Sequence, residues 1–161
     1  MAHNILSQCD QCLAAYLISV GAGNNDDVYP AKRAEDKTFP DTICWSSKAR
    51  LITPNSAVYV VSAIVQVRTD PCVDVNQSVD DTVSASKDRV AATFDAFWAG
   101  VGPSSAGLAA AITDAGRGAG LSDFTVQSCI VLGMESGFDA KGNAWTDTID
   151  LELVCCPNTI S

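Results

Sequence analysis

The sequence predicts an α+β domain in which a mainly antiparallel sheet of four to five strands packs against an N-terminal helix and one or two central helices. Near the N-terminus and in the middle of the chain, apolar residues recur every three or four positions, which is the period of a buried helical face. In the last third they alternate, which is the period of a strand with one buried face. With 161 residues, the chain suits a single domain over residues 1–161.

The first predicted element is an amphipathic helix from Ile5 to Val20, with Asn4 as its N-cap and Gly21 as its stop. Residues 21–42 follow and carry glycine, asparagine, aspartate and two prolines without any periodicity. We therefore expect a long loop over 21–42. Loops of this length inside compact domains are uncommon and are usually either mobile or bound to a partner.

Extended structure is predicted next. Short strands are expected at 43–45 and 49–53, and a long strand is expected from Ala57 to Thr69. Both alternating sets of side chains on the long strand are apolar over most of its length. We therefore expect this strand to lie in the centre of the sheet and to be covered on both faces.

A second helix is predicted after Asp80 and Asp81, because negative charge favours a helix N-terminus. Its expected buried side chains are Val83, Val90, Ala91, Phe94, Phe97 and Trp98. A shorter third helix over 105–115 places Leu108 and Ile112 toward the core. The glycine-rich residues 116–120 are then expected to form a flexible connection.

The last third predicts a long β-hairpin. Two alternating runs, Phe124 to Met134 and Trp145 to Cys155, are joined by turn-like residues at 139–143. One predicted face of the second run consists of Ile149, Leu151, Leu153 and Cys155, and the other consists of Thr148, Asp150, Glu152 and Val154. The first face is expected to be buried, and the second to be more exposed to solvent.

The net charge of −9 belongs to the second part of the chain, since residues up to Arg68 contain six acids and six bases, and those from Thr69 onward contain thirteen acids and four bases. Such a surface repels a polyanion, so binding that depends on phosphate contacts is not expected. Charged residues make up 18% of the chain, below the typical value of about 25%. A charge-poor surface favours coverage by partner molecules.

The seven cysteines are an odd number and no signal-peptide pattern precedes them, so we expect synthesis in a reducing cytoplasm. No apolar run reaches the ~18 residues of a membrane span. Cys9 and Cys12 lie on the apolar helical stripe, which favours burial over redox work. Together with Cys155 and Cys156 they would supply four thiolates for zinc, but adjacent strand residues point to opposite faces. No metal or cofactor is therefore expected.

Other catalytic patterns are also weak. His3 is the only histidine, which excludes triads and histidine-rich metal sites. The acid pairs Asp26-Asp27 and Asp80-Asp81 occur where aspartate is favoured by local hydrogen bonds. Residues 139–143 lack calcium-loop spacing, residues 116–120 lack the lysine of a phosphate loop, and the tryptophans are expected to be core or rim aromatics. No catalytic residues are assigned, and an enzyme is not expected.

Four segments carry a likeness to a known family: the N-terminal helix 5–20, the strand 59–68, the helix 89–98 and the closing strand 145–153. In order and character, these elements resemble the tail terminator and related tail-completion (neck) proteins of long-tailed bacteriophages. The likeness spans nearly the whole chain.

The resemblance implies a non-enzymatic virion protein that forms a ring, expected to be hexameric, at the head-proximal end of the tail tube. Such a ring ends tube growth and joins the tail to the head connector. Its partners would be further copies of itself, the tail tube protein and the head-tail connector proteins. DNA would pass through the lumen without specific binding, since phosphate repulsion opposes it. The protein would be made and assembled in the host cytoplasm and would reside in the tail or neck.

Two alternatives remain open at this point. The chain would also suit another virion component, such as a minor tail or capsid decoration protein. The alternative from a different class is a small cytoplasmic enzyme or ligand-binding α+β domain that uses Asp26 and Asp27 or Cys9 and Cys12. Candidate interface or lumen residues are Asp26, Asp27, Asp139, Lys141, Asn143, Trp145, Asp147, Asp150 and Glu152.

Overall fold

A computed structural model describes residues 5–25, 27–30, 40–54, 57–69, 79–101, 105–121, 123, 124–139 and 144–157. The elements in chain order are α1 (Ile5–Ser19), β1 (Val28–Tyr29), β2 (Asp41–Leu51), β3 (Tyr59–Thr69), α2 (Val79–Phe97), the 3-10 turn η1 (Trp98–Val101), α3 (Ser105–Gly118), β4 (Phe124–Asp139) and β5 (Ala144–Pro157).

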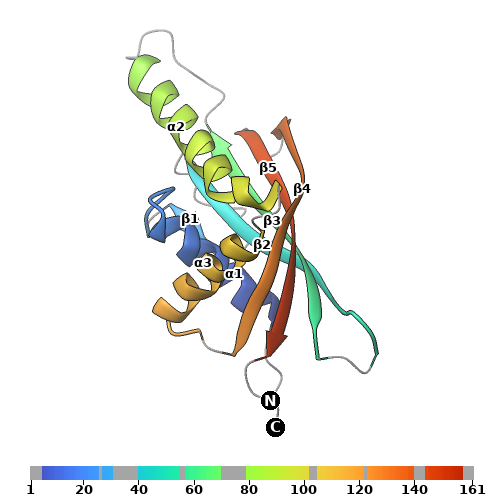
Figure 1. Ribbon diagram of the computed structural model, residues 1–161. Helices are drawn as coiled ribbons and strands as arrows, with labels where there is room; N and C mark the ends of the chain where they lie inside the picture. The colour runs from blue at the N-terminus through green and yellow to red at the C-terminus, as the bar shows by residue number, and fades with distance from the viewer. Residues whose placement is uncertain are drawn as a thin grey trace.

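The strands form one sheet in the order β1-β2-β3-β5-β4. Every neighbouring pair is antiparallel except β1 and β2, which are parallel. The three helices lie on the same side of this strongly twisted sheet (Figure 1). The predicted α+β fold with a mainly antiparallel sheet is therefore confirmed, and β3 occupies the predicted central position.

Two details of the first half differ from the prediction. The expected strands at 43–45 and 49–53 are one strand, β2, in which Ser47 is an extra residue between Ser46 and Lys48, opposite Ala63 and Ser62. The expected loop over 21–42 contains β1, and β2 already begins at Asp41. A two-residue strand and a single bulged residue are both too short to leave a periodic pattern.

The predicted end of α1 at Gly21 is confirmed. Gly21 has a φ of 77°, a conformation that glycine adopts without strain. The Ala22 amide donates to the Leu17 carbonyl at 2.9 Å, and the Gly21 amide donates to Ile18 at 3.1 Å. This pair of hydrogen bonds satisfies two carbonyls at the helix end. The expected N-cap, Asn4, lies outside the described residues.

The glycine-rich residues 116–120 are not a flexible connection. α3 continues to Gly118, and Gly120, with a φ of 87°, ends it in the same way as Gly21 ends α1. The Leu121 amide donates to the Gly116 carbonyl at 2.9 Å. A Cβ on Gly116 would lie 2.4 Å from Cys12 Sγ. The glycine therefore allows α3 to approach α1 closely.

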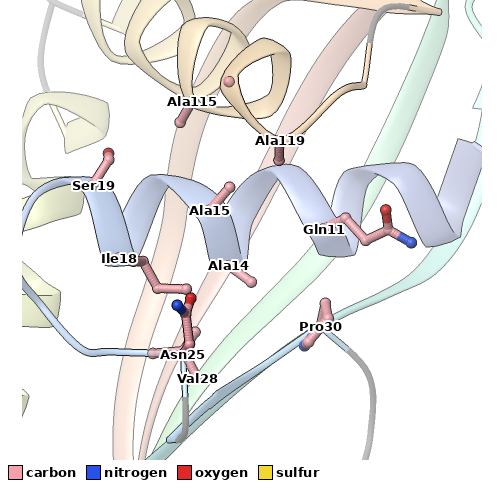
Figure 2. Close-up of a pocket in the computed structure, with 11 residues that line it drawn as sticks. Gln11, Ala14, Ala15, Ile18, Ser19, Asn25, Val28, Pro30, Ala115 and Ala119 are labelled. Atoms are coloured by element: carbon pink, nitrogen blue, oxygen red, sulfur yellow. The ribbon is translucent and has the colours of Figure 1, made fainter.

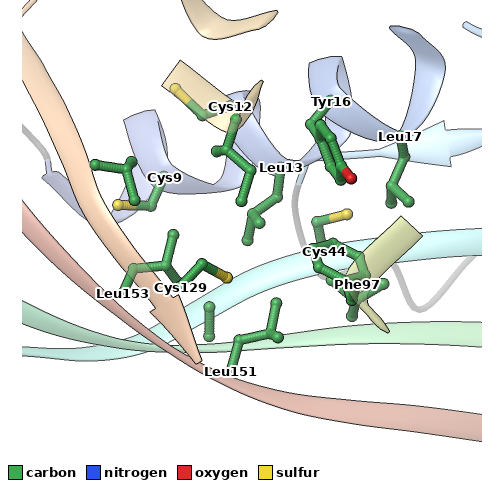
Figure 3. Packing of buried hydrophobic residues seen from close by; sticks show 14 of the residues in the cluster. Cys9, Cys12, Leu13, Tyr16, Leu17, Cys44, Phe97, Cys129, Leu151 and Leu153 are labelled. Carbon is green, nitrogen blue, oxygen red and sulfur yellow. The ribbon is translucent and has the colours of Figure 1, made fainter. Parts of the chain in front are cut away.

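The core lies between the helices and one face of the sheet, which we call the core face (Figure 3). Its largest fully buried side chains include Leu13, Leu17, Phe97, Ile112, Ile149, Leu151, Leu153, Val61 and Val65. The rings of Tyr16 and Phe97 meet edge to face with centroids 5.6 Å apart. The predicted buried face of the closing strand, from Ile149 to Cys155, is confirmed, as is the burial of Leu108 and Ile112.

The opposite side of the sheet, which we call the open face, bears no described helix (Figure 1). On the open face of β3, Ser62, Ile64 and Gln66 are only half-buried and do not belong to the core cluster. The expectation that β3 would be covered on both faces is therefore wrong for its middle. Val and Ile are favoured in strands even on half-buried positions, so apolar character on both sides did not require two covering layers.

The buried stripe of α2 also differs from the prediction. Phe97 is fully buried, and Val90 and Phe94 are half-buried, but Trp98 is 66% exposed. Trp98 begins η1, and the tighter 3-10 turn moves its side chain off the α-helical stripe. Ala91 is exposed as well, and the side chain of Val83 lies outside the described residues.

Asp10 fastens α1 to the bulge in β2. Its carboxylate accepts hydrogen bonds from the Ser46 amide at 2.5 Å and from the Ser46 hydroxyl at 2.8 Å. Burial raises the pKa of Asp10 from 3.8 to about 6, although the two bonds from Ser46 act in the opposite direction. The carboxylate also satisfies an edge amide of β2, which would otherwise be free to pair with another strand.

The hairpin of β4 and β5 is confirmed, but the strict alternation expected for its first strand is wrong. β4 contains two extra residues, Gln127 and Leu132, that face no partner in β5. Between these two bulges, Cys129 and Val131 point to the core face, and Ile130 is 39% exposed. Each bulge shifts the alternation by one residue.

Candidate interaction surface

The sequence-predicted residues of the closing hairpin divide between the two faces of the sheet. Asp147 of β5 pairs with buried Val67 of β3 and therefore lies on the core face. Its carboxylate accepts a hydrogen bond from the Ser136 hydroxyl. Asp150 and Glu152 lie on the open face, opposite Ile64 and Ser62. The structure therefore does not bring all of the predicted acids together.

An aromatic pair marks the tip of the hairpin. Phe138 and Trp145 meet edge to face with ring centroids 5.4 Å apart, and each is about half exposed. Beside them, a groove of about 400 Å³ separates α2 from the sheet. It is lined by Thr69, Val90, Ala91, Ser136, Trp145, Thr146 and Asp147. Asp139 is the last residue of β4, and Lys141 and Asn143 lie outside the described residues.

Asp27 serves an internal contact. Its carboxylate pairs with the Arg89 guanidinium of α2 at 2.5 Å, and Arg89 also donates to the Thr42 hydroxyl at 3.3 Å. The pair ties α2 to the start of β2. Asp27 is therefore engaged within the chain, and Asp26 lies outside the described residues.

The buried cysteines Cys9, Cys12 and Cys129 of the core have raised pKa values and are unreactive. A hydrogen bond to Cys155, whose sulfur lies 3.9 Å away, and burial raise the pKa of Cys9 far above its ordinary value. Burial raises the pKa of Cys12 to about 11 and that of Cys129 to about 12. These groups are protonated thiols at neutral pH and thus poor nucleophiles and poor metal ligands.

Within the described ranges, no group of three or more His, Cys, Asp or Glu side chains could hold a metal ion. Cys155 is fully buried whereas its neighbour Cys156 is half-buried. The two cysteines therefore diverge, as expected for consecutive strand residues.

A second groove, of about 600 Å³, runs along α1 beneath the end of α3 (Figure 2). Its lining consists of Gln11, Ala14, Ala15, Ile18, Ser19, Asn25, Val28, Pro30, Ala115, Gly118 and Ala119. None of these lining residues carries a charge. The groove consequently offers small apolar surfaces and a few amides and hydroxyls, with no acid-base pair for catalysis.

The open face carries two separated sets of charged residues. Lys48 and Arg50 lie on β2, where the strand runs out toward a projecting loop (Figure 1), and both are exposed. Together with exposed Leu51 and Ile52 at the end of the hairpin, they form what we call the basic arm. Within the arm, Leu51 pairs with Tyr59 and faces the side opposite to Lys48 and Arg50. Glu135 of β4 with Asp150 and Glu152 of β5 form what we call the acidic surface.

Exposed apolar side chains lie along β4 on both sides: Ile130 pairs with Glu152 on the open face, whereas Met134 pairs with Ile149 on the core-face side. Ile130 and Met134 are each 39% exposed, and Leu132 is 60% exposed. β4 is the last strand of the sheet on this side. β4 is 16 residues long, which is long for an edge strand. No described strand pairs with its outer side, although the Thr113 hydroxyl of α3 accepts a hydrogen bond from the Val126 amide at 3.0 Å near one end.

The sequence prediction missed this apolar edge and the basic arm. The available signal was local: consecutive polar residues, Gln127-Ser128, are followed by the consecutive apolar residues Ile130-Val131-Leu132. Such a change of phase within an alternating run indicates a bulge. The same reasoning applies to Ser46-Ser47-Lys48, where the bulge turns Lys48 toward the open face.

No known protein-family model matches this chain, and no curated protein matches it in sequence. No helix within the described part of the chain is long and apolar enough to cross a membrane.

Proposed function

We propose that this protein is a non-enzymatic structural component of a bacteriophage virion. In this proposal it forms a ring, hexameric by the family resemblance, at the head-proximal end of a long tail. The ring ends growth of the tail tube and joins the tail to the head connector. The observation that carries the proposal is the long edge strand β4, whose outer side pairs with no described strand and which exposes apolar side chains.

The exposed edge favours assembly over catalysis. Soluble monomers usually protect edge strands with charges, prolines, bulges or covering segments, and of these β4 has two bulges. β4 nevertheless presents Ile130, Leu132, Met134 and Phe138 to solvent, together with Trp145 of β5. Ile130 lies on the open face, whereas Met134, Phe138 and Trp145 lie on the core-face side. Exposed apolar side chains on both sides of an edge strand favour its coverage by another protein.

The charge distribution supports a role beside DNA. The net charge is −9, and thirteen of the nineteen acids follow Arg68. A ring with this charge repels the phosphate backbone and removes the free energy gained from counterion release. DNA would then move through the ring without adhering to it.

The proposal is tested by determining the mass of the purified protein and by imaging it with isolated tail tubes in the electron microscope. Closed rings, and caps on one end of the tubes, are expected. Leu132→Asp should weaken assembly, whereas the control Val20→Asp, at a residue that is 50% exposed at the end of α1, should not. The proposal would be refuted if the protein remains monomeric at high concentration and does not bind the ends of tail tubes.

Another virion role, as a minor tail or capsid decoration protein, would use the same exposed edge. Location in the particle separates these roles. A reconstruction of the virion that shows the protein away from the neck would replace the terminator assignment with one of them.

A further inference from the structure

We propose that the basic arm of one copy binds the acidic surface of a second copy. The basic arm consists of Lys48, Arg50, Leu51 and Ile52, and the acidic surface consists of Glu135, Asp150 and Glu152. The inference deepens the proposed function and rests on it for the ring. It assigns residues to both sides of the contact between neighbouring copies.

The charges on the two surfaces have no partners within the described part of one chain. Neither Lys48 nor Arg50 forms an ion pair there, and the described ion pairs, Arg68–Asp41 and Arg89–Asp27, involve none of the three acids. Lys48 and Glu152 both flank Ser62, on opposite sides of β3. Strands lie about 4.8 Å apart, so the two backbones are about 10 Å apart, with uncharged Ser62 of β3 between them.

The fold builds both surfaces by the same device. The bulge at Ser47 turns Lys48 and Arg50 to the open face, and without it they would point to the core face. The bulge at Gln127 likewise brings Ile130 to the open face beside Glu152. Both surfaces also carry apolar area, since Ile52 is 49% exposed on the arm, whereas Leu51, 38% exposed, pairs with Tyr59 and faces the other side of the hairpin.

Charge complementarity identifies the second surface as another copy of this chain. Opposite charges on the two surfaces steer association and fix its register. The apolar side chains beside them supply area that is removed from water. A polyanion such as DNA would meet only two cations on the arm and a protein of net charge −9, which makes nucleic acid a poor occupant.

The two surfaces are different sets of residues on the same open face, and the contact is taken as head to tail because the ring of the proposed function requires it. Each copy then has one free arm and one free acidic surface, and repetition of the same contact closes a ring when the rotation between copies allows it. The arm projects from the loop end of β2 and β3 (Figure 1), where it can reach a neighbour without moving the core.

Charge reversal tests the contact in the full-length protein. The arm variant is Lys48→Glu with Arg50→Glu, and the surface variant is Asp150→Lys with Glu152→Lys. The control, Asp95→Lys with Asp114→Lys at exposed positions on α2 and α3, makes the same charge change as the surface variant and the opposite change to the arm variant. Assembly is measured by analytical ultracentrifugation at low salt, with far-ultraviolet circular dichroism to verify folding.

Each reversed variant should dissociate at least tenfold more readily than the unmodified protein, and the control should not. The chain that carries all four substitutions, or an equimolar mixture of the two variants, should reassemble because the charges are again complementary. If rings still form in both reversed variants, this contact is wrong, but the proposed ring is not refuted. Rescue that yields only dimers would support the contact and refute the ring, whereas a monomeric unmodified protein would refute both.

Discussion

Replacing Asp10 with asparagine should change how stability depends on pH. The Asp10 carboxyl is 9% exposed and accepts two hydrogen bonds from Ser46. Asparagine has nearly the same shape and keeps an oxygen that can accept these bonds, but it cannot titrate. The variant therefore removes a buried ionisable group while it preserves the contact between α1 and the bulge of β2.

The magnitude follows from the pKa of Asp10, which burial raises from 3.8 to about 6. Because the folded pKa is the higher one, the contribution of Asp10 to stability is complete below about pH 4 and is lost as the pH rises through 6. Each pH unit of difference corresponds to about 1.36 kcal/mol, so the full loss is about 3 kcal/mol. Between about pH 4.5 and pH 7.5, the loss is about 2 kcal/mol.

Urea unfolding followed by tryptophan fluorescence measures this effect in both proteins at several pH values in that range. The free energy of unfolding of Asp10→Asn, relative to the unmodified protein, should increase by about 2 kcal/mol from the lowest to the highest pH. Contributions of all other titrating groups cancel in this difference. If the two pH profiles run parallel, Asp10 titrates normally and the reasoning about its burial is wrong.

Three further outcomes are expected. Gly116→Ala should lower the free energy of unfolding by about 1–2 kcal/mol because its Cβ would lie 2.4 Å from Cys12 Sγ, and thermal unfolding should show recovery when Cys12→Ala is added. Arg68→Met should cost about 3–5 kcal/mol in urea unfolding because it leaves buried Asp41 without its ion-pair partner; adding Asp41→Asn should restore part of this, and no restoration would contradict the assignment. Maleimide labelling of the native protein with peptide mass mapping should find Cys156 modified before the five buried cysteines, and equal labelling of Cys12 would contradict its burial.

The strongly periodic segments of the chain could be predicted from the sequence. α1 and the buried side of β5 repeat their apolar residues over several turns or pairs, and the structure confirms both. Gly21 marked a helix end because a positive φ favours glycine. Such features depend on neighbours along the chain, which a single sequence displays.

The candidate site could be predicted only in part. Asp150 and Glu152 were assigned to the wetter face of the closing hairpin, and they do lie on the open face. The basic arm was missed because it depends on one bulged residue, Ser47, whose effect appears only once β2 is paired with β3. Asp27 was predicted as an interface or lumen residue, and its ion pair was missed because its partner, Arg89, lies 62 positions away in sequence.

The two bulges of β4 behave as a compensated pair. Gln127 puts the alternation out of phase and Leu132 returns it to phase. Because neither extra residue faces a partner in β5, deletion of Gln127 or of Leu132 would remove one bulge and leave every paired residue of β4 on its present face. Deletion of a paired residue would instead shift the register and turn the side chains beyond it to the other face. β4 should therefore tolerate a change in length of one residue at these two positions and not elsewhere.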